Sequence, residues 1–190
     1  MKTKYIFILF ILVALVQLSI PAQMIFSQEA VLKSGVAYKF KTQPVDPSDP
    51  FKGKYITLNF DVSNYKTKDS LWERNDEVLV YLTTDSLGYA KIDAVSKYVL
   101  ERNTNDYVKA KAYWYSTYSK ELVIRFPFNK YYMKETKAYA AETAVRDRQR
   151  DSLVNNTHAL VYVQEGEAVL KDVIIDDISI KDYVEKSNLD

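Results

Sequence analysis

The stretch Gly53-Lys54-Tyr55-Ile56-Thr57-Leu58-Asn59-Phe60-Asp61-Val62 decides the fold class, because from Tyr55 onward its side chains alternate in polarity. One face is apolar and consists of Ile56, Leu58, Phe60 and Val62. The other face carries Tyr55, Thr57, Asn59 and Asp61. A period of two residues is typical of a β-strand with one buried face. We therefore expect one strand here, packed through its apolar face on the core of a β-rich domain.

The same period of two recurs on both sides of this strand. It predicts further strands over residues 36–41, 78–83, 89–94, 108–114, 122–126, 159–164, 168–175 and 178–180. The short links at 84–88, 116–120 and 165–166 predict hairpins between neighbouring strands.

The period changes to that of a helix between residues 130 and 153. The apolar residues at helical spacing are Tyr131, Ala138, Ala141, Val145 and Leu153. Glu142 and Arg146 form an i,i+4 pair, which supports a helix. Many short strands with one helix predict a mainly β (α+β) fold, a small antiparallel barrel or sandwich with one packed helix.

The N-terminal region carries an apolar segment of membrane length. Residues 5–26 contain no charged side chain and would extend about 33 Å as a helix, enough for a hydrocarbon core of roughly 30 Å. Lys2 and Lys4 precede the segment and favour an N-terminus in the cytoplasm. The alternative is a signal peptide cleaved after Ala22, for which Ile20 is a poor residue at position −3. We expect a retained anchor in a single-pass protein of the inner membrane, with the C-terminal domain in the periplasm.

These features divide the chain into three parts. They are an anchor over residues 1–27, an extracytoplasmic β-rich domain over 28–183 and a polar tail over 184–190. A domain of this length buries about two-thirds of its surface on folding, which is enough for a core of its own.

Composition excludes several classes of function. The net charge is +1 and no basic stripe with interleaved aromatic residues is present, so we expect no nucleic acid partner. The chain has 4 glycines and 0 cysteines, which argues against glycine-rich phosphate loops and excludes thiolate metal sites. The single histidine, His158, is expected at a strand edge rather than as a catalytic base. We therefore expect no cofactor, no metal and no enzymatic activity.

Two groups of residues are candidates for ligand or partner binding. The first lies in a proline-rich loop and at the start of the strand that follows it: Pro44, Asp46, Asp49, Phe51, Gly53 and Tyr55. Asp46 and Asp49 could contribute oxygen ligands to a calcium ion, or they could serve only as turn residues beside proline. Gly53 has a simple backbone explanation, because glycine can leave the loop with a positive φ.

The second group lies at and after the predicted start of the helix and consists of Tyr132, Glu135 and Glu142. The two glutamates are seven residues apart, hence nearly on one helical face. They could form an acid–base pair of the kind used in glycoside hydrolysis, or belong to a solvated helix face neutralised by nearby basic residues. A concave aromatic pocket near Tyr55 and Tyr132 would favour ligand binding.

Residues 53–60 resemble the motif that names the GDYXXLXY family of bacterial membrane proteins. Gly53, Tyr55 and Leu58 match the motif, whereas Lys54 stands in place of its aspartate and Phe60 in place of its final tyrosine. The loop 44–51 is similar to the family's Pro-Val-Asp-Pro-x-Asp-Pro-Phe element. Residues 126–142 and 166–175 resemble its helix entrance and its closing hairpin. The lysine at position 54 argues against any chemistry that depends on a carboxylate there.

The resemblance implies a single-span, membrane-anchored protein without an assigned activity. Members of the family often lie beside multi-pass membrane proteins. The resemblance thus implies an accessory or interaction domain that partners a multi-pass membrane protein. The alternative is a ligand-binding or sensing domain of the cell envelope.

Overall fold

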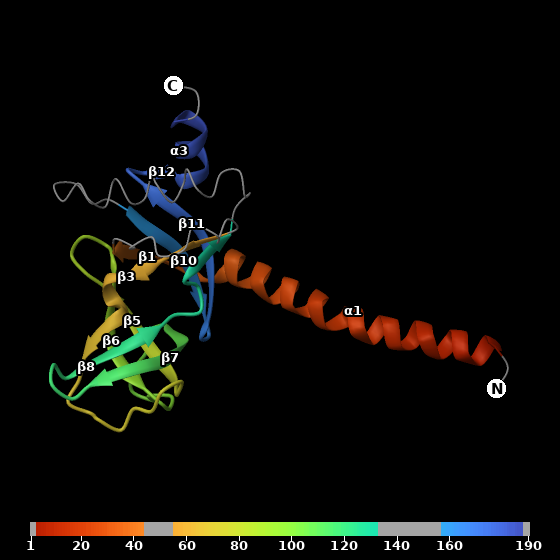
Figure 1. Ribbon diagram of the computed structural model, residues 1–190, viewed down its shortest axis with the longest axis horizontal. Coiled ribbons are helices and arrows are strands. Elements are labelled where there is room, and N and C mark those ends of the chain that lie inside the picture. Colours follow the sequence, from red (N-terminus) through yellow and green to blue (C-terminus); the bar gives the residue numbers. More distant parts are fainter. Residues whose placement is uncertain (1–2, 44–54, 133–156, 188–190) are drawn as a thin grey trace.

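The structure is a computed structural model that describes residues 3–43, 55–132 and 157–187, and this part of the chain is mainly β (Figure 1). The first sheet has the order β12-β11-β10-β1-β3. Its strands are β1 (Val36–Gln43), β3 (Asn59–Phe60), β10 (Thr157–Gln164), β11 (Glu167–Ile175) and β12 (Ile178–Ser179).

The second sheet has the order β4-β8-β7-β5-β6. Its strands are β4 (Asn64–Lys66), β5 (Glu77–Thr84), β6 (Ala90–Ser96), β7 (Tyr107–Ser116) and β8 (Glu121–Arg125). A separate antiparallel pair joins β2 (Tyr55–Thr57) to β9 (Lys130–Tyr132). The described helices are α1 (Thr3–Ser34), the short 3-10 helix η1 (Asp61–Ser63) and α3 (Ile180–Ser187).

The two sheets share one hydrophobic core. At its centre lie the rings of Phe40, Phe60, Phe126 and Phe128, with centroids between 4.9 and 6.0 Å apart. Most of these pairs meet edge to face or tilted, the geometry that aromatic quadrupoles favour. Two isolated parallel bridges, 39↔89 and 108↔166, also connect the first sheet to the second. The expected β-rich fold, a small antiparallel barrel or sandwich, is therefore confirmed.

Three predicted hairpins are present, formed by β5 with β6, β7 with β8, and β10 with β11. The turn between β10 and β11 contains Glu165 with φ 50° and Gly166 with φ 87°. Positive φ at both central residues fits the right-handed twist of the flanking strands. A side chain at Gly166 would also lie 2.7 Å from the ring of Tyr107, so the hairpin tip requires glycine where it meets β7.

The strand predicted over residues 55–62 has the expected buried face but is not continuous. Ile56, Leu58 and Phe60 are buried, as the alternation predicts. However, β2 ends before Leu58 and pairs with β9, while β3 begins after it and pairs with β1. Val62 lies in η1, outside any strand. The backbone N–H of Leu58 still donates to the carbonyl of Asn129, at 2.8 Å, beside the β2–β9 pair, and the chain then continues into β3 on β1.

The predicted start of the long helix is wrong. Residues Lys130–Tyr132 form β9, because Tyr131 pairs with Ile56 and buries its ring in the core. The remainder of that predicted helix lies outside the described residues. Among the described residues, the C-terminal end of α1, the 3-10 helix η1 and the short helix α3 contact the sheets, and the first residue of α3, Ile180, is fully buried.

Helix α1 leads directly into the first sheet. It continues through Pro21 and ends one residue before Gly35, which precedes β1. The Gly35 N–H donates to the Val31 carbonyl at 2.8 Å, and the Val31 side chain is 5% exposed, so the last turns of α1 lie against β10 and β11. A β-carbon at Gly35 would be 2.5 Å from the Val31 oxygen and 3.0 Å from the Val163 oxygen. The contact between helix and sheet is therefore close at the backbone, and α1 points away from the domain (Figure 1).

Candidate functional site

Of the predicted site residues, the structure describes Tyr55 and Tyr132 and brings them together. They are register partners in the β2–β9 pair, and their rings lie 5.5 Å apart at 58°. The other predicted site residues lie outside the described residues: Pro44, Asp46, Asp49, Phe51, Gly53, Glu135 and Glu142. The calcium and acid–base alternatives therefore stay predictions.

The pairing of β2 with β9 explains the placement of Tyr55. Ile56 and Tyr131 point into the core, so their neighbours along both strands point toward the surface. Tyr132 is 66% exposed. The ammonium of Lys130 lies 4.5 Å from the centre of the Tyr55 ring, which is a cation–π contact. Tyr55 is thus held between a second aromatic ring and a cation.

A groove of about 640 Å³ begins at Tyr55 and extends to β8. Its far side contains Tyr113 and Arg125, whose guanidinium carbon lies 4.2 Å from the Tyr113 ring centre. Asn59 and Asn129 add amide groups that can donate and accept hydrogen bonds. We call this the Tyr55 groove. Two aromatic rings, each next to a cation, equip it to bind planar or anionic groups, and sequence reasoning missed all of its residues except Tyr55.

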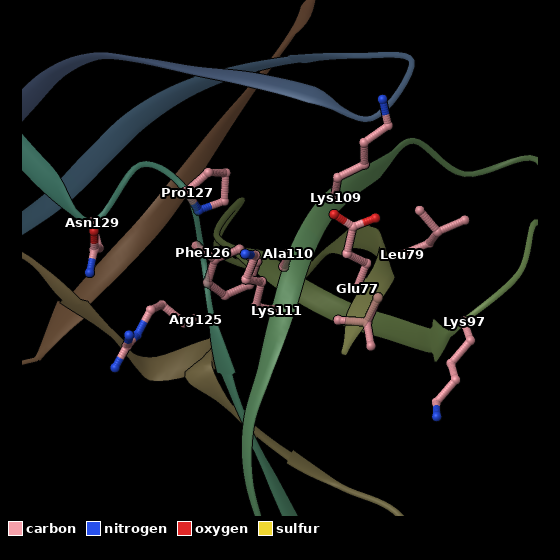
Figure 2. A pocket seen from close by; sticks show the side chains of 11 residues that line it. Glu77, Leu79, Lys97, Lys109, Ala110, Lys111, Arg125, Phe126, Pro127 and Asn129 are labelled. Atoms are coloured by element: carbon pink, nitrogen blue, oxygen red, sulfur yellow. The ribbon is translucent and has the colours of Figure 1, made fainter. Parts of the chain in front are cut away.

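A second groove, of about 390 Å³, shares Arg125, Phe126 and Asn129 with the Tyr55 groove (Figure 2). Its floor is apolar and includes Val78, Ala110 and Phe126. Its rim carries four cations and one carboxylate: Lys97, Lys109, Lys111, Arg125 and Glu77. Figure 2 shows Arg125 and Lys97 on opposite sides of the groove, with Glu77 between them.

Ion pairs at this second groove reduce its positive charge. The Lys97 ammonium donates to Asp76 at 2.6 Å, which lowers the pKa of that carboxyl and raises the pKa of Lys97. Lys109 contacts Glu167 at 2.9 Å, and this hydrogen bond raises the pKa of Lys109. Both pairs are partly or fully exposed, so water and salt weaken them. The groove therefore combines an apolar floor with a largely compensated rim, which suits a protein segment better than a small anion.

The buried titratable groups hold elements together. The Tyr38 hydroxyl of β1 donates to Asp106 at 2.9 Å, and burial together with this bond raises the pKa of Tyr38 to about 12. The Tyr131 hydroxyl of β9 donates to Asp172 of β11 at 2.7 Å, and burial likewise raises its pKa. Neither phenol can ionise at neutral pH, so both act as hydrogen-bond donors that fix one element to another.

His158 is not at a strand edge, contrary to the sequence prediction. It lies in β10, between β1 and β11, and is 4% exposed. Burial, together with the positive charge of Lys39, lowers the pKa of the imidazole, so it is neutral at pH 7. Within the described ranges, no group of three or more histidine, aspartate or glutamate side chains is arranged to hold a metal ion.

These observations define a class of protein: a β-rich domain joined without a break to one apolar helix long enough to cross a membrane. The sequence model of the family described as GDYXXLXY protein matches residues 17–173, which is most of the chain. The chain belongs to the GDYXXLXY protein family. The comparisons with curated proteins and with solved structures gave no match.

The structure gives the family motif a physical meaning in this chain. Leu58 and Phe60 are core residues at the point where the chain changes sheets, and both are 1% exposed. Tyr55, by contrast, is half-buried and borders the Tyr55 groove. Of the described motif residues, Leu58 and Phe60 therefore stabilise the fold and Tyr55 contributes to the surface.

Proposed function

We propose that the protein is a membrane-anchored accessory domain, which α1 holds outside the cytoplasm in a fixed position beside a multi-pass membrane protein. The observation that carries the proposal is the contact between α1 and the first sheet. Val31 is buried against the domain. Gly35 is the single residue between the end of α1 and the start of β1, and it lies in close contact with the backbone of Val31 and Val163, so no flexible linker separates the helix from the sheet. A helix fixed in the membrane would therefore fix the orientation of the domain as well.

The helix itself supports a retained anchor. Apolar side chains from Tyr5 to Phe26 are exposed on all sides of α1, and such a surface is stable in lipid rather than in water. The first charged residue after them is Glu29, which forms an exposed i,i+4 pair with Lys33 at 4.0 Å. Ala22, the alternative cleavage position, lies in the middle of this helix, and the family match begins upstream of it at residue 17.

The height of the domain above the bilayer follows from the helix. If the hydrocarbon ends at Phe26, the eight residues 27–34 extend about 12 Å, so the domain lies close to the lipid headgroups. Lys2 and Lys4 favour a cytoplasmic N-terminus and hence a domain on the outer side of the inner membrane. A domain in this position can contact the external loops of a membrane protein, and the second groove, with its apolar floor, is a suitable surface.

The proposal is tested by purifying the tagged full-length protein from membranes solubilised in a mild detergent. A matched variant replaces Glu77 and Leu79, which line the second groove but are not buried in the core, with serines and leaves the buried Val78 unchanged. We expect a multi-pass membrane protein in near-stoichiometric amount with the native chain and less of it with the variant. Recovery of the native chain alone from the soluble fraction would contradict the proposal.

A second candidate function, a ligand-binding domain of the cell envelope, is favoured by the Tyr55 groove. Its rings and cations suit an anionic or aromatic small molecule. Thermal-shift screening of such compounds against the native chain and Tyr113→Ala tests this. A compound that stabilises the native chain but not the variant would support ligand binding, and the absence of any such compound would count against it.

A further inference from the structure

Gln17 places an amide side chain near the middle of the apolar segment. Phe26 lies nine positions after Gln17, a rise of about 14 Å, which is close to half of a hydrocarbon core of roughly 30 Å. The side chain is exposed on α1. In a bilayer this position corresponds to the hydrocarbon, where an amide without a hydrogen-bond partner is costly.

Pro21 adds a second unsatisfied polar group at the same residue. In an α-helix the carbonyl of residue 17 accepts a hydrogen bond from the N–H of residue 21. Because residue 21 is a proline inside α1, it has no N–H to donate. The Gln17 backbone carbonyl therefore needs another donor, and prolines in membrane helices are tolerated where neighbouring groups supply one.

The described part of the chain offers Gln17 no such group. The most apolar window of α1 has 0% of its residues buried against the rest of the structure. Ser19, another polar residue nearby, needs no partner because its hydroxyl already donates to the Val16 carbonyl at 2.7 Å. In the centre of the segment, the side-chain amide and the backbone carbonyl of Gln17 thus need hydrogen-bond partners from another molecule.

Resting on the proposed function, we propose that Gln17 is the contact site for a transmembrane helix of the membrane-embedded partner. That helix carries a polar side chain at the same depth, which donates to the Gln17 carbonyl and exchanges hydrogen bonds with its amide. Ser, Thr, Asn and Gln are the side chains that perform this role between membrane helices. The interaction would select the face of α1 that contains Gln17.

The position of the domain relative to Gln17 indicates whether a helix of the partner protein or a second copy of α1 binds at Gln17. Val31 follows Gln17 by fourteen residues, almost four helical turns, so the face that docks on the domain and the face of Gln17 nearly coincide. The domain therefore overhangs whatever lies against Gln17. A partner helix that ends at the bilayer surface fits under the domain, whereas a second copy of this chain would bring its own docked domain into the same space.

Photo-crosslinking in intact membranes tests this assignment. A photoreactive amino acid replaces Val13, one turn before Gln17, or as a matched control Leu15, which lies on the opposite face. We expect an adduct with a membrane-spanning peptide of one partner protein, identified by mass spectrometry, from position 13 and little from position 15. Gln17→Leu should reduce the position-13 adduct about three- to thirtyfold, and Gln17→Asn should restore much of it.

The possible outcomes separate this inference from the proposed function. Gln17→Leu makes α1 more apolar, so the variant stays in the membrane fraction if the anchor is retained. Equal adducts from both positions, an adduct between two copies of the chain, or insensitivity to Gln17→Leu would overturn the inference while the anchor stands. Absence of α1 from the membrane fraction of the native protein would overturn both.

Discussion

The substitution Gly35→Ala tests the fixed contact between α1 and the domain. Its β-carbon would lie 2.5 Å from the Val31 carbonyl oxygen, whereas ordinary contacts begin near 3.4 Å, so the backbone would have to shift by about 0.9 Å. The second close atom, the Val163 oxygen at 3.0 Å, is also backbone and belongs to a paired strand. Neither atom can rotate away as a side-chain end could.

The magnitude follows from the two ways in which the protein can respond. If the sheet and helix absorb the shift, overpacking costs typically 1–3 kcal/mol. If α1 detaches instead, the protein loses the burial of Val31, which contributes about 1.5–3 kcal/mol. Both routes predict a loss of about 2 kcal/mol, which lowers the urea midpoint by about 1 M for a domain of this size.

The assay is urea unfolding of the full-length protein in detergent, followed by tryptophan fluorescence, with limited trypsin cleavage after Lys33 as a second readout. Gly88→Ala is the matched control: it meets no atom within 4 Å, and its cost comes only from a positive φ in a distant turn. Lys33 is exposed but helical in the native protein, so we expect trypsin to cleave after it in Gly35→Ala and to leave that bond intact in Gly88→Ala. A Gly35→Ala protein with the native midpoint and no cleavage after Lys33 would show that Gly35 is not needed for the contact between α1 and the domain.

Three further predictions concern the domain. Leu58→Asp places an unpaired charge in the core and should abolish cooperative unfolding, and unchanged thermal melting would contradict the observed strand faces. Because the folded pKa of His158 is lowered below its unfolded value near 6.5, stability should fall as the pH drops from 7 to 5.5. Urea midpoints should show this slope, and His158→Gln should flatten it. Tyr131→Phe removes the donor to Asp172 and should cost about 1–3 kcal/mol in urea unfolding, whereas Tyr118→Phe, at a 99% exposed position, should change little. A Tyr131→Phe protein as stable as the native one would show that this bond does not support the fold.

The sequence predicted the strands and hairpins well, because alternation reports directly which side chains are buried. The hairpin at residues 165–166 was predictable because a two-residue β-turn of this kind needs positive φ at both residues, and a glycine in the sequence indicates such a turn. The break at Leu58 was not, because burial still alternates when a strand leaves one sheet for another. The strand at Tyr131 was mistaken for the start of a helix because one large apolar residue fits both periods.

The candidate sites were less predictable than the fold. Tyr55 and Tyr132 were named as the neighbourhood in which an aromatic pocket would favour ligand binding, and the β2–β9 pair places their rings in contact. Tyr113 and Arg125 reach the same groove from β7 and the end of β8, and no sequence spacing links them to Tyr55. The contact of Gly35 with Val163 likewise joins residues that are distant in the chain. Such contacts depend on the sheet order, which local periodicity does not contain.

The retention of α1 as a membrane anchor is tested by the intact mass of the full-length protein extracted from membranes. We expect a membrane-bound species of 22.0 kDa plus the mass of the tag, with the whole of α1 still attached to the domain. A shorter species that begins after Ala22 and appears in the soluble fraction would contradict it.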